Sequence, residues 1–103
     1  MHITIEFIRA FMLGLWYLSP LLIPLLAAIV AAGQILGKIE KWSEVDALYF
    51  TFITSLTIGY GDLRPTIKRT KLLAIGIGLL GLILNGIIVA ITLQSVSIAF
   101  TPP

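Results

Sequence analysis

The sequence predicts an all-α membrane protein in which two transmembrane helices flank a short re-entrant helix and a glycine-containing loop. First, the 103 residues are 58% hydrophobic and only 12% charged, which is more apolar surface than a soluble domain of this size can bury. Second, two charge-free intervals are long enough to cross a bilayer, which takes about 20 residues. Third, the charge-free stretch 47–61 between them has 15 residues, too few to cross, and ends in Gly59-Tyr60-Gly61.

Composition narrows the functional classes for this single domain, residues 1–103. The chain has no cysteine, so disulfides and thiolate metal sites are excluded. A formal charge of +2 without a basic amphipathic face argues against a nucleic-acid partner. The sequence shows no metal-ligand cluster and no pair of nucleophile and base, so we do not expect an enzyme. The N-terminus also lacks the pattern of a removable signal peptide.

Residues 1–17 are predicted to form an interfacial helix lying along the bilayer surface. Glu6 and Arg9 interrupt its apolar pattern, and Trp16 and Tyr17 are typical of the headgroup level. The same residues are compatible with an extension of the first transmembrane helix, and both interpretations stay open. The apolar positions at helical spacing are Ile5, Ile8, Phe11, Met12 and Leu15.

The outer transmembrane helix is predicted over 19–37. Pro20 falls in its first turn, where a missing N–H is tolerated, while Pro24, one turn deeper, is a candidate kink. A polar interval, 38–46, follows.

A short helix is predicted over 44–56 and a loop over 57–62. Ser43 with Asp46 three residues later resembles a capping box, which places the helix start near Glu44.

The inner transmembrane helix is predicted over 70–100, and it has no charge from Leu72 to Phe100. A helix of that length extends about 43 Å, whereas the hydrocarbon core of a bilayer is about 30 Å thick. This helix must therefore tilt, bend or protrude on one side.

The loop between the short helix and the inner helix must line water or be buried by protein, since bare backbone is not tolerated in lipid. Gly59 and Gly61 alternate with Ile58 and Tyr60, and glycine permits backbone angles that let successive carbonyls point to one side. The C-terminal end of the preceding helix would favour a cation nearby. A tight Gly-X-Gly turn capped by Asp62 is the alternative that these residues leave open.

The motif Thr57-Ile58-Gly59-Tyr60-Gly61-Asp62, with the flanking 48–51 and 63–65, resembles the potassium channel pore module. The resemblance covers residues 19–100 and is closest to two-transmembrane bacterial, archaeal and viral members. It implies that potassium ions are coordinated by backbone carbonyls and by the Thr57 hydroxyl, and that four copies form a homotetramer in the lipid bilayer. The implied carbonyls are those of Thr57, Ile58, Gly59 and Tyr60.

The resemblance also implies which residues support the filter, and it shows where this sequence departs from the family. Gly61, Asp62 and Tyr49 would support the filter, with Asp62 at the outer mouth. The sequence departs from the family pattern at three positions. Leu56 stands where many relatives have a second threonine, Ile53 stands where some have an acidic residue, and Ile58 replaces the commoner valine.

The inner helix offers candidates for a cavity and a gate. Gly81 matches the hinge glycine of many potassium channels, with close helix packing as the alternative. Asn85 is a polar residue in an apolar span, so it either faces the cavity or makes an interhelical hydrogen bond. Steps of three and four residues from Asn85 lead to Leu82, Val89 and Leu93, which would line the cavity and close it by dewetting.

The resemblance places both termini in the cytoplasm of a bacterial, archaeal or viral-type plasma membrane. Six of the seven Lys and Arg residues lie between the two transmembrane helices, where the positive-inside rule predicts cytoplasm. We give priority to the filter motif over this charge count. The sequence has no voltage-sensing arginine helix and no soluble ligand domain, so a gate lies within 1–103 or in a cytoplasmic regulatory domain outside this sequence.

The leading prediction is a potassium-selective channel. Two rival functions are the membrane subunit of a potassium transporter, for which four non-identical filter repeats in one long chain would be typical, and a non-conducting membrane scaffold subunit.

Overall fold

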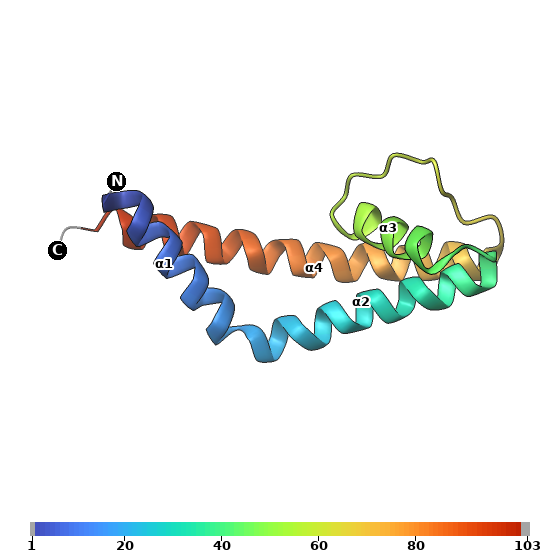
Figure 1. The fold of residues 1–103 in the computed structure, drawn as a ribbon, viewed down its shortest axis with the longest axis horizontal. Coiled ribbons are helices and arrows are strands. Elements are labelled where there is room, and N and C mark those ends of the chain that lie inside the picture. Colours follow the sequence, from blue (N-terminus) through green and yellow to red (C-terminus); the bar gives the residue numbers. More distant parts are fainter. Residues whose placement is uncertain (1, 102–103) are drawn as a thin grey trace.

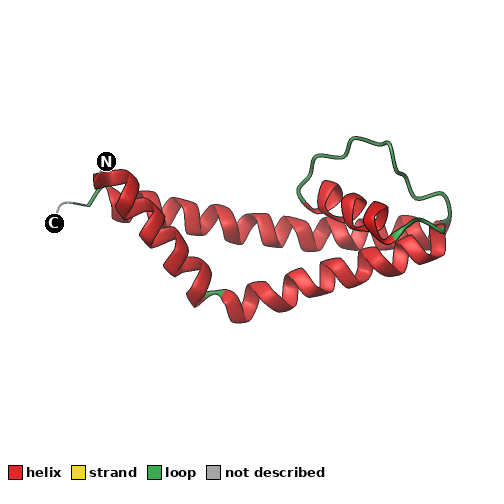
Figure 2. Ribbon diagram, viewed as in Figure 1, coloured by secondary structure: helices red, strands yellow, loops and turns green. Residues whose placement is uncertain are grey.

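A computed structural model describes residues 2–101, which form four α-helices and no strand (Figures 1 and 2). The helices are α1 (His2–Tyr17), α2 (Ser19–Glu40), α3 (Glu44–Ser55) and α4 (Lys68–Ala99). Both α2 and α4 are long and apolar enough to cross a membrane. The all-helical class with two membrane-length helices is therefore confirmed.

Helix α4 is the long axis of the molecule, which measures 56 × 26 × 20 Å. At 32 residues it is about 48 Å long, so α2, at 22 residues and about 33 Å, runs beside only part of it. Helix α1, which precedes α2 in the chain, packs across the turns of α4 that α2 does not reach. As a result, both ends of the described chain lie close together, away from α3 and its loop (Figure 1).

The chain bends between α1 and α2 at Leu18, the N-cap of α2 (φ −94°, ψ 4°). The hydroxyl of Ser19 donates to the carbonyl of Trp16 at 2.7 Å, which closes the bend. Pro20 lies at the start of α2, where no intrahelical N–H is needed. Pro24 lies inside α2, and the helix is continuous through it.

Helix α3 is wedged between α2 and α4 by small residues. Its Ala47, Thr51 and Ser55, four residues apart, are each no more than 1% exposed. A Cβ atom added at Gly33 of α2 would collide with the Thr51 side chain, and one at Gly37 would collide with Ala47. Small residues on both sides therefore let the helices approach closely, as in other membrane helix pairs.

The polar start of α3 is fixed by local hydrogen bonds. The backbone N–H of Asp46 donates to the hydroxyl of Ser43 at 3.1 Å, so Ser43 caps the helix. Gln34 of α2 donates its side-chain amide to the carbonyl of Glu44 at 3.3 Å. Phe50 belongs to the buried core with Ile29, Leu36, Ile77 and Leu84, and the ring of Trp42 packs against it at a centroid distance of 5.1 Å.

Candidate functional site

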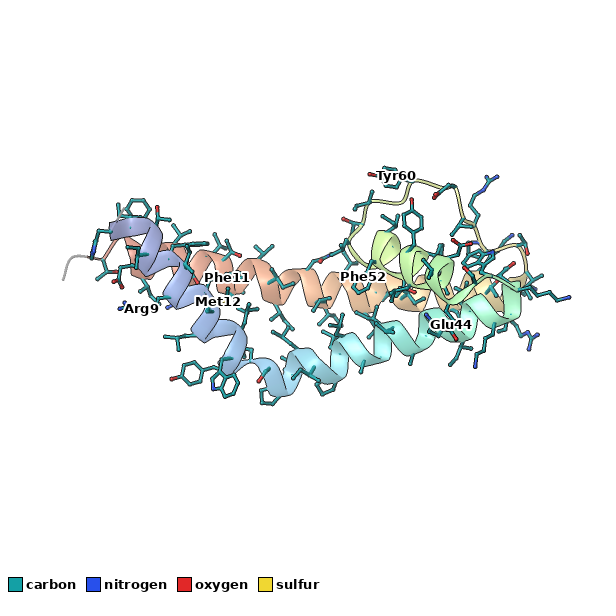
Figure 3. All side chains as sticks on the ribbon, viewed as in Figure 1. Arg9, Phe11, Met12, Glu44, Phe52 and Tyr60 are labelled. Atoms are coloured by element: carbon teal, nitrogen blue, oxygen red, sulfur yellow. The ribbon has the colours of Figure 1, made fainter. Side chains whose placement is uncertain are left out.

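The loop between α3 and α4, residues 56–67, bulges away from the helices at one end of the molecule (Figures 1 and 3). Tyr60 is 70% exposed and points away from α3, and Ile58 is also exposed. Tyr60 is mostly exposed and Ile58 is about half exposed, so the segment 57–62 presents mainly backbone and two apolar side chains that the described chain leaves partly uncovered. A cavity of about 170 Å³ separates the loop from α3.

The backbone of this segment has left-handed φ angles at every second residue. The values are 65° at Thr57, 59° at Gly59 and 84° at Gly61. Glycine adopts such angles freely, but a β-branched residue at positive φ is a true outlier. The strain at Thr57 is of order 1–3 kcal/mol, and strain of this kind gathers at functional sites.

The amides of this segment are turned toward α3. The N–H groups of Ile58 and Gly59 both donate to the carbonyl of Ile53, at 2.9 and 3.2 Å, and the N–H of Thr57 donates to Thr54 at 3.2 Å. The described chain has no cis peptide bond. In a trans peptide the carbonyl of one residue points opposite to the N–H of the next, so the carbonyls of Thr57 and Ile58 both point away from α3.

Asp62 and Tyr49 meet across the gap between the loop and α3. Hydrogen bonding to Asp62 raises the pKa of the Tyr49 hydroxyl, and desolvation and the negative charge of Asp62 act in the same direction. The protonated phenol is therefore the favoured partner of the carboxylate. This contact joins the middle of α3 to the end of the predicted filter.

A second polar contact fixes the far end of the loop. The carboxylate of Glu40, the last residue of α2, accepts from the backbone N–H and the hydroxyl of Thr66, each at 2.7 Å. It also accepts from the hydroxyl of Thr70 in α4 at 2.5 Å. Glu40 thus supplies negative charge to the N-terminal end of α4, where the helix dipole favours it.

The inner helix meets α3 at Gly81 and Asn85. A Cβ atom added at Gly81 would collide with the carbonyl oxygen of Ser55 and lie 2.6 Å from its Cα. The side-chain amide of Asn85 donates to the same carbonyl at 2.9 Å. In this chain, Gly81 permits close packing and Asn85 makes an interhelical hydrogen bond, the two alternatives raised by the sequence.

The other cavity and gate candidates lie on exposed positions of α4. Leu82, Val89 and Leu93 are 59%, 54% and 66% exposed, so most of each side chain is free of contacts within the described chain.

The Thr57 side chain makes a local contact at the start of the predicted filter, where its hydroxyl donates to the carbonyl of Leu56 at 2.6 Å.

The sequence alone does not single out two supporting residues. Glu40 is one of three acidic residues in the polar interval 38–46, and nothing in the local sequence marks it as the partner of Thr66 and Thr70. Ser55 is the second such residue. A signal for it exists in the sequence, because Ala47, Thr51 and Ser55 lie four residues apart and form a face of small residues on one helix.

Comparison with known proteins gives the class. A family model described as an ion channel matches residues 21–97, and the chain therefore belongs to this ion channel family and is a membrane protein. Since ion channels are not enzymes, the expectation of a non-enzyme is confirmed.

Several curated relatives are potassium channels. Two pore potassium channel a of Oryza sativa subsp. japonica is 39% identical over 71 residues, which are 69% of this chain and 20% of that protein. Two-pore potassium channel 5 of Arabidopsis thaliana is 44% identical over 55 residues, 48% of this chain and 14% of the relative. Potassium channel subfamily K member 12 of Rattus norvegicus is 44% identical over 45 residues, 42% of this chain and 10% of the relative.

The chain thus spans a fifth or less of the length of these relatives. The search of solved structures gave no match.

Proposed function

We propose that the chain is the pore of a potassium-selective channel, in which four copies place their 57–62 segments around one axis. The observation that carries this proposal is the common direction of the Thr57 and Ile58 carbonyls, which follows from the amide hydrogen bonds to α3. In a β-strand, successive carbonyls point to opposite sides. Here the left-handed angles at Thr57, Gly59 and Gly61 support a strand with its carbonyls on one side.

In the assembled pore, the carbonyls of Thr57, Ile58, Gly59 and Tyr60 replace the hydration shell of a potassium ion. The Thr57 hydroxyl is the innermost ligand. It would bind the ion through its oxygen lone pairs, which stay available while its hydrogen donates to the carbonyl of Leu56. Gly61, Asp62 and Tyr49 support the outer end. The C-terminal end of α3 carries partial negative charge and favours a cation below the filter.

In the proposed membrane topology, α3 is a re-entrant helix, and α2 and α4 are the outer and inner transmembrane helices. The ends of the described chain lie opposite the loop (Figure 1), so the loop and the termini would face opposite sides of the membrane. The resemblance to potassium channels puts the loop outside, which makes both termini cytoplasmic and leaves the basic residues near the loop outside. If reagents that do not cross membranes labelled Lys41 only from the cytoplasmic side, this topology would be reversed.

Potassium flux into proteoliposomes tests the function directly. Purified chain should carry potassium much faster than sodium, and external barium should block the flux. Equal permeation of both ions would contradict selectivity, and no flux from a correctly assembled tetramer would favour a scaffold subunit. A flux that requires a second ion gradient would favour a transporter subunit.

The relatives favour a channel over those two alternatives, since the names of the three described above all contain "potassium channel". Two of them are called two-pore channels, whereas this sequence has one filter motif. Cross-linking of the purified chain should give a ladder ending at four copies. A ladder ending at two copies would contradict the homotetramer.

A further inference from the structure

The last turn of α3 has an unusual set of hydrogen-bond partners. The last four carbonyls of a helix have no N–H partner within the helix. In α3 these carbonyls belong to residues 52–55. Three of them accept N–H groups from the chain that follows: Phe52 from Leu56, Ile53 from Ile58 and Gly59, and Thr54 from Thr57. The fourth, Ser55, accepts from the side chain of Asn85, thirty residues away on α4.

Asn85 can make this bond because α4 lies against the end of α3. Gly81, one turn earlier, allows the α4 backbone to touch Ser55, since a Cβ there would collide with the Ser55 carbonyl. Ser55 as a whole is 1% exposed, so water does not reach its carbonyl to replace a lost partner. A buried carbonyl without a donor is destabilising.

We propose that Asn85 is a positioning residue that fixes the inner end of the filter to the inner helix. Ser55 precedes Thr57 by two residues, so a shift of α4 at Asn85 moves the base of the filter with it. This inference rests on the proposed function and deepens it, because it assigns Asn85 to the link between α4 and the filter. In this proposal Asn85 acts through its hydrogen bond to Ser55, and not as a residue that faces the cavity and attracts cations.

A structural experiment tests the link without any ion flux. Hydrogen exchange of the Thr57, Ile58 and Gly59 amides is measured in the full chain reconstituted in bilayers. Asn85→Leu removes the donor at similar size, and exchange should become roughly three to eighteen times faster, the range expected from measured interhelical hydrogen bonds in membranes. Thr92→Val is the matched control, because the Thr92 hydroxyl donates at 2.8 Å to Ile88 within α4 itself. Exchange that is equal in Asn85→Leu and wild type would overturn the proposal.

A functional experiment separates the two roles of Asn85. In proteoliposomes, Asn85→Leu and Asn85→Asp should both lower the ratio of potassium to sodium permeability, since an ionised carboxylate cannot donate to Ser55. Asn85→Gln, which keeps a donor, should recover most of the ratio, and Thr92→Val should leave it unchanged.

A cavity residue predicts a different pattern. Asn85→Asp would then add four charges to the pore, strengthen block by internal magnesium and leave the permeability ratio intact, which would overturn the proposal. If the wild type carries no potassium, the proposed function fails, and the exchange experiment still decides the role of Asn85.

Discussion

The two ends of the molecule are packed in different ways. At the loop end, α3 is wedged between α2 and α4, and Gly81 brings the backbone of α4 against the backbone of Ser55. At the opposite end, α1 crosses α4, and the atoms nearest to a Cβ at Gly14 would belong to the side chain of Ile91, the closest at 2.7 Å. A largely apolar cavity of about 530 Å³ lies there among α1, α2 and α4.

This difference shows which part of the chain can change shape. A side chain can rotate out of the way, whereas backbone that touches backbone cannot. The loop end should therefore keep one geometry, as a selective filter requires. The α1 end has side-chain contacts and unfilled space, so it should tolerate substitutions.

The largest effect should come from Gly81→Ala. The new Cβ meets the backbone of Ser55, so we expect a loss of about 1–3 kcal/mol in stability, as in other overpacked sites. The loss should appear although alanine is about 1 kcal/mol more favourable than glycine within a helix. Thermal unfolding of the tetramer in detergent measures it.

Gly14→Ala is the matched variant at the other end. The contacting methyl of Ile91 is held by a stiff χ1 angle, but the neighbouring cavity gives this side chain space to move. With the helix preference of alanine partly offsetting the cost, the loss of stability should be smaller than that of Gly81→Ala, below about 1 kcal/mol. Equal losses in the two variants would show that the ends are packed alike.

Gly59→Ala should act on conduction through the backbone angle. No atom of the described chain lies within 4 Å of the added Cβ, but a φ of 59° is left-handed, and alanine pays about 1–2 kcal/mol there. The filter should distort, and potassium flux should fall at least tenfold with the tetramer intact. Gly86→Ala, also without a neighbour within 4 Å but helical, is the control and should conduct normally.

Removing the Glu40 carboxylate should have a smaller effect. Glu40→Gln keeps the size of the side chain but weakens the three bonds to Thr66 and Thr70, because charge-assisted hydrogen bonds are stronger than neutral ones. We expect a lower unfolding temperature, by less than that of Gly81→Ala. Glu6→Gln, whose carboxylate makes only a surface pair with Arg9 at 3.6 Å, should leave that temperature nearly unchanged, and an equal decrease would argue against the role of Glu40.

The smallest effect should come from Tyr49 at high pH. Its pKa is raised above 10.0 by Asp62, so the folded state favours the protonated phenol, and the contact is fully present below pH 10. It should be lost as the pH rises through the raised value. Potassium selectivity of the wild type should therefore decline above pH 10, while Tyr49→Phe should show a reduced, pH-independent selectivity. A decline of the same size in Tyr49→Phe would assign it to another group.

The sequence predicted the parts of the fold that depend on local pattern. Charge-free length identified the helices at 19–37 and 70–100, and the alternating glycines identified the backbone-lined loop. Contacts between distant residues were not predictable, because nothing near Asn85 indicates that Ser55 is its acceptor. The same holds for Glu40, whose partners Thr66 and Thr70 are brought near only by the pairing of α2 with α4. The sequence could not decide whether Gly81 is a hinge or a close packing contact, because both roles require a small residue.

The most direct test of the central claim is the structure of the assembled chain in potassium and, separately, in sodium. In potassium, a row of density should lie on a fourfold axis, bordered by the carbonyls of Thr57, Ile58, Gly59 and Tyr60, and its pattern should change in sodium. A loop whose carbonyls turn back onto α3, with no density between the four copies, would contradict it.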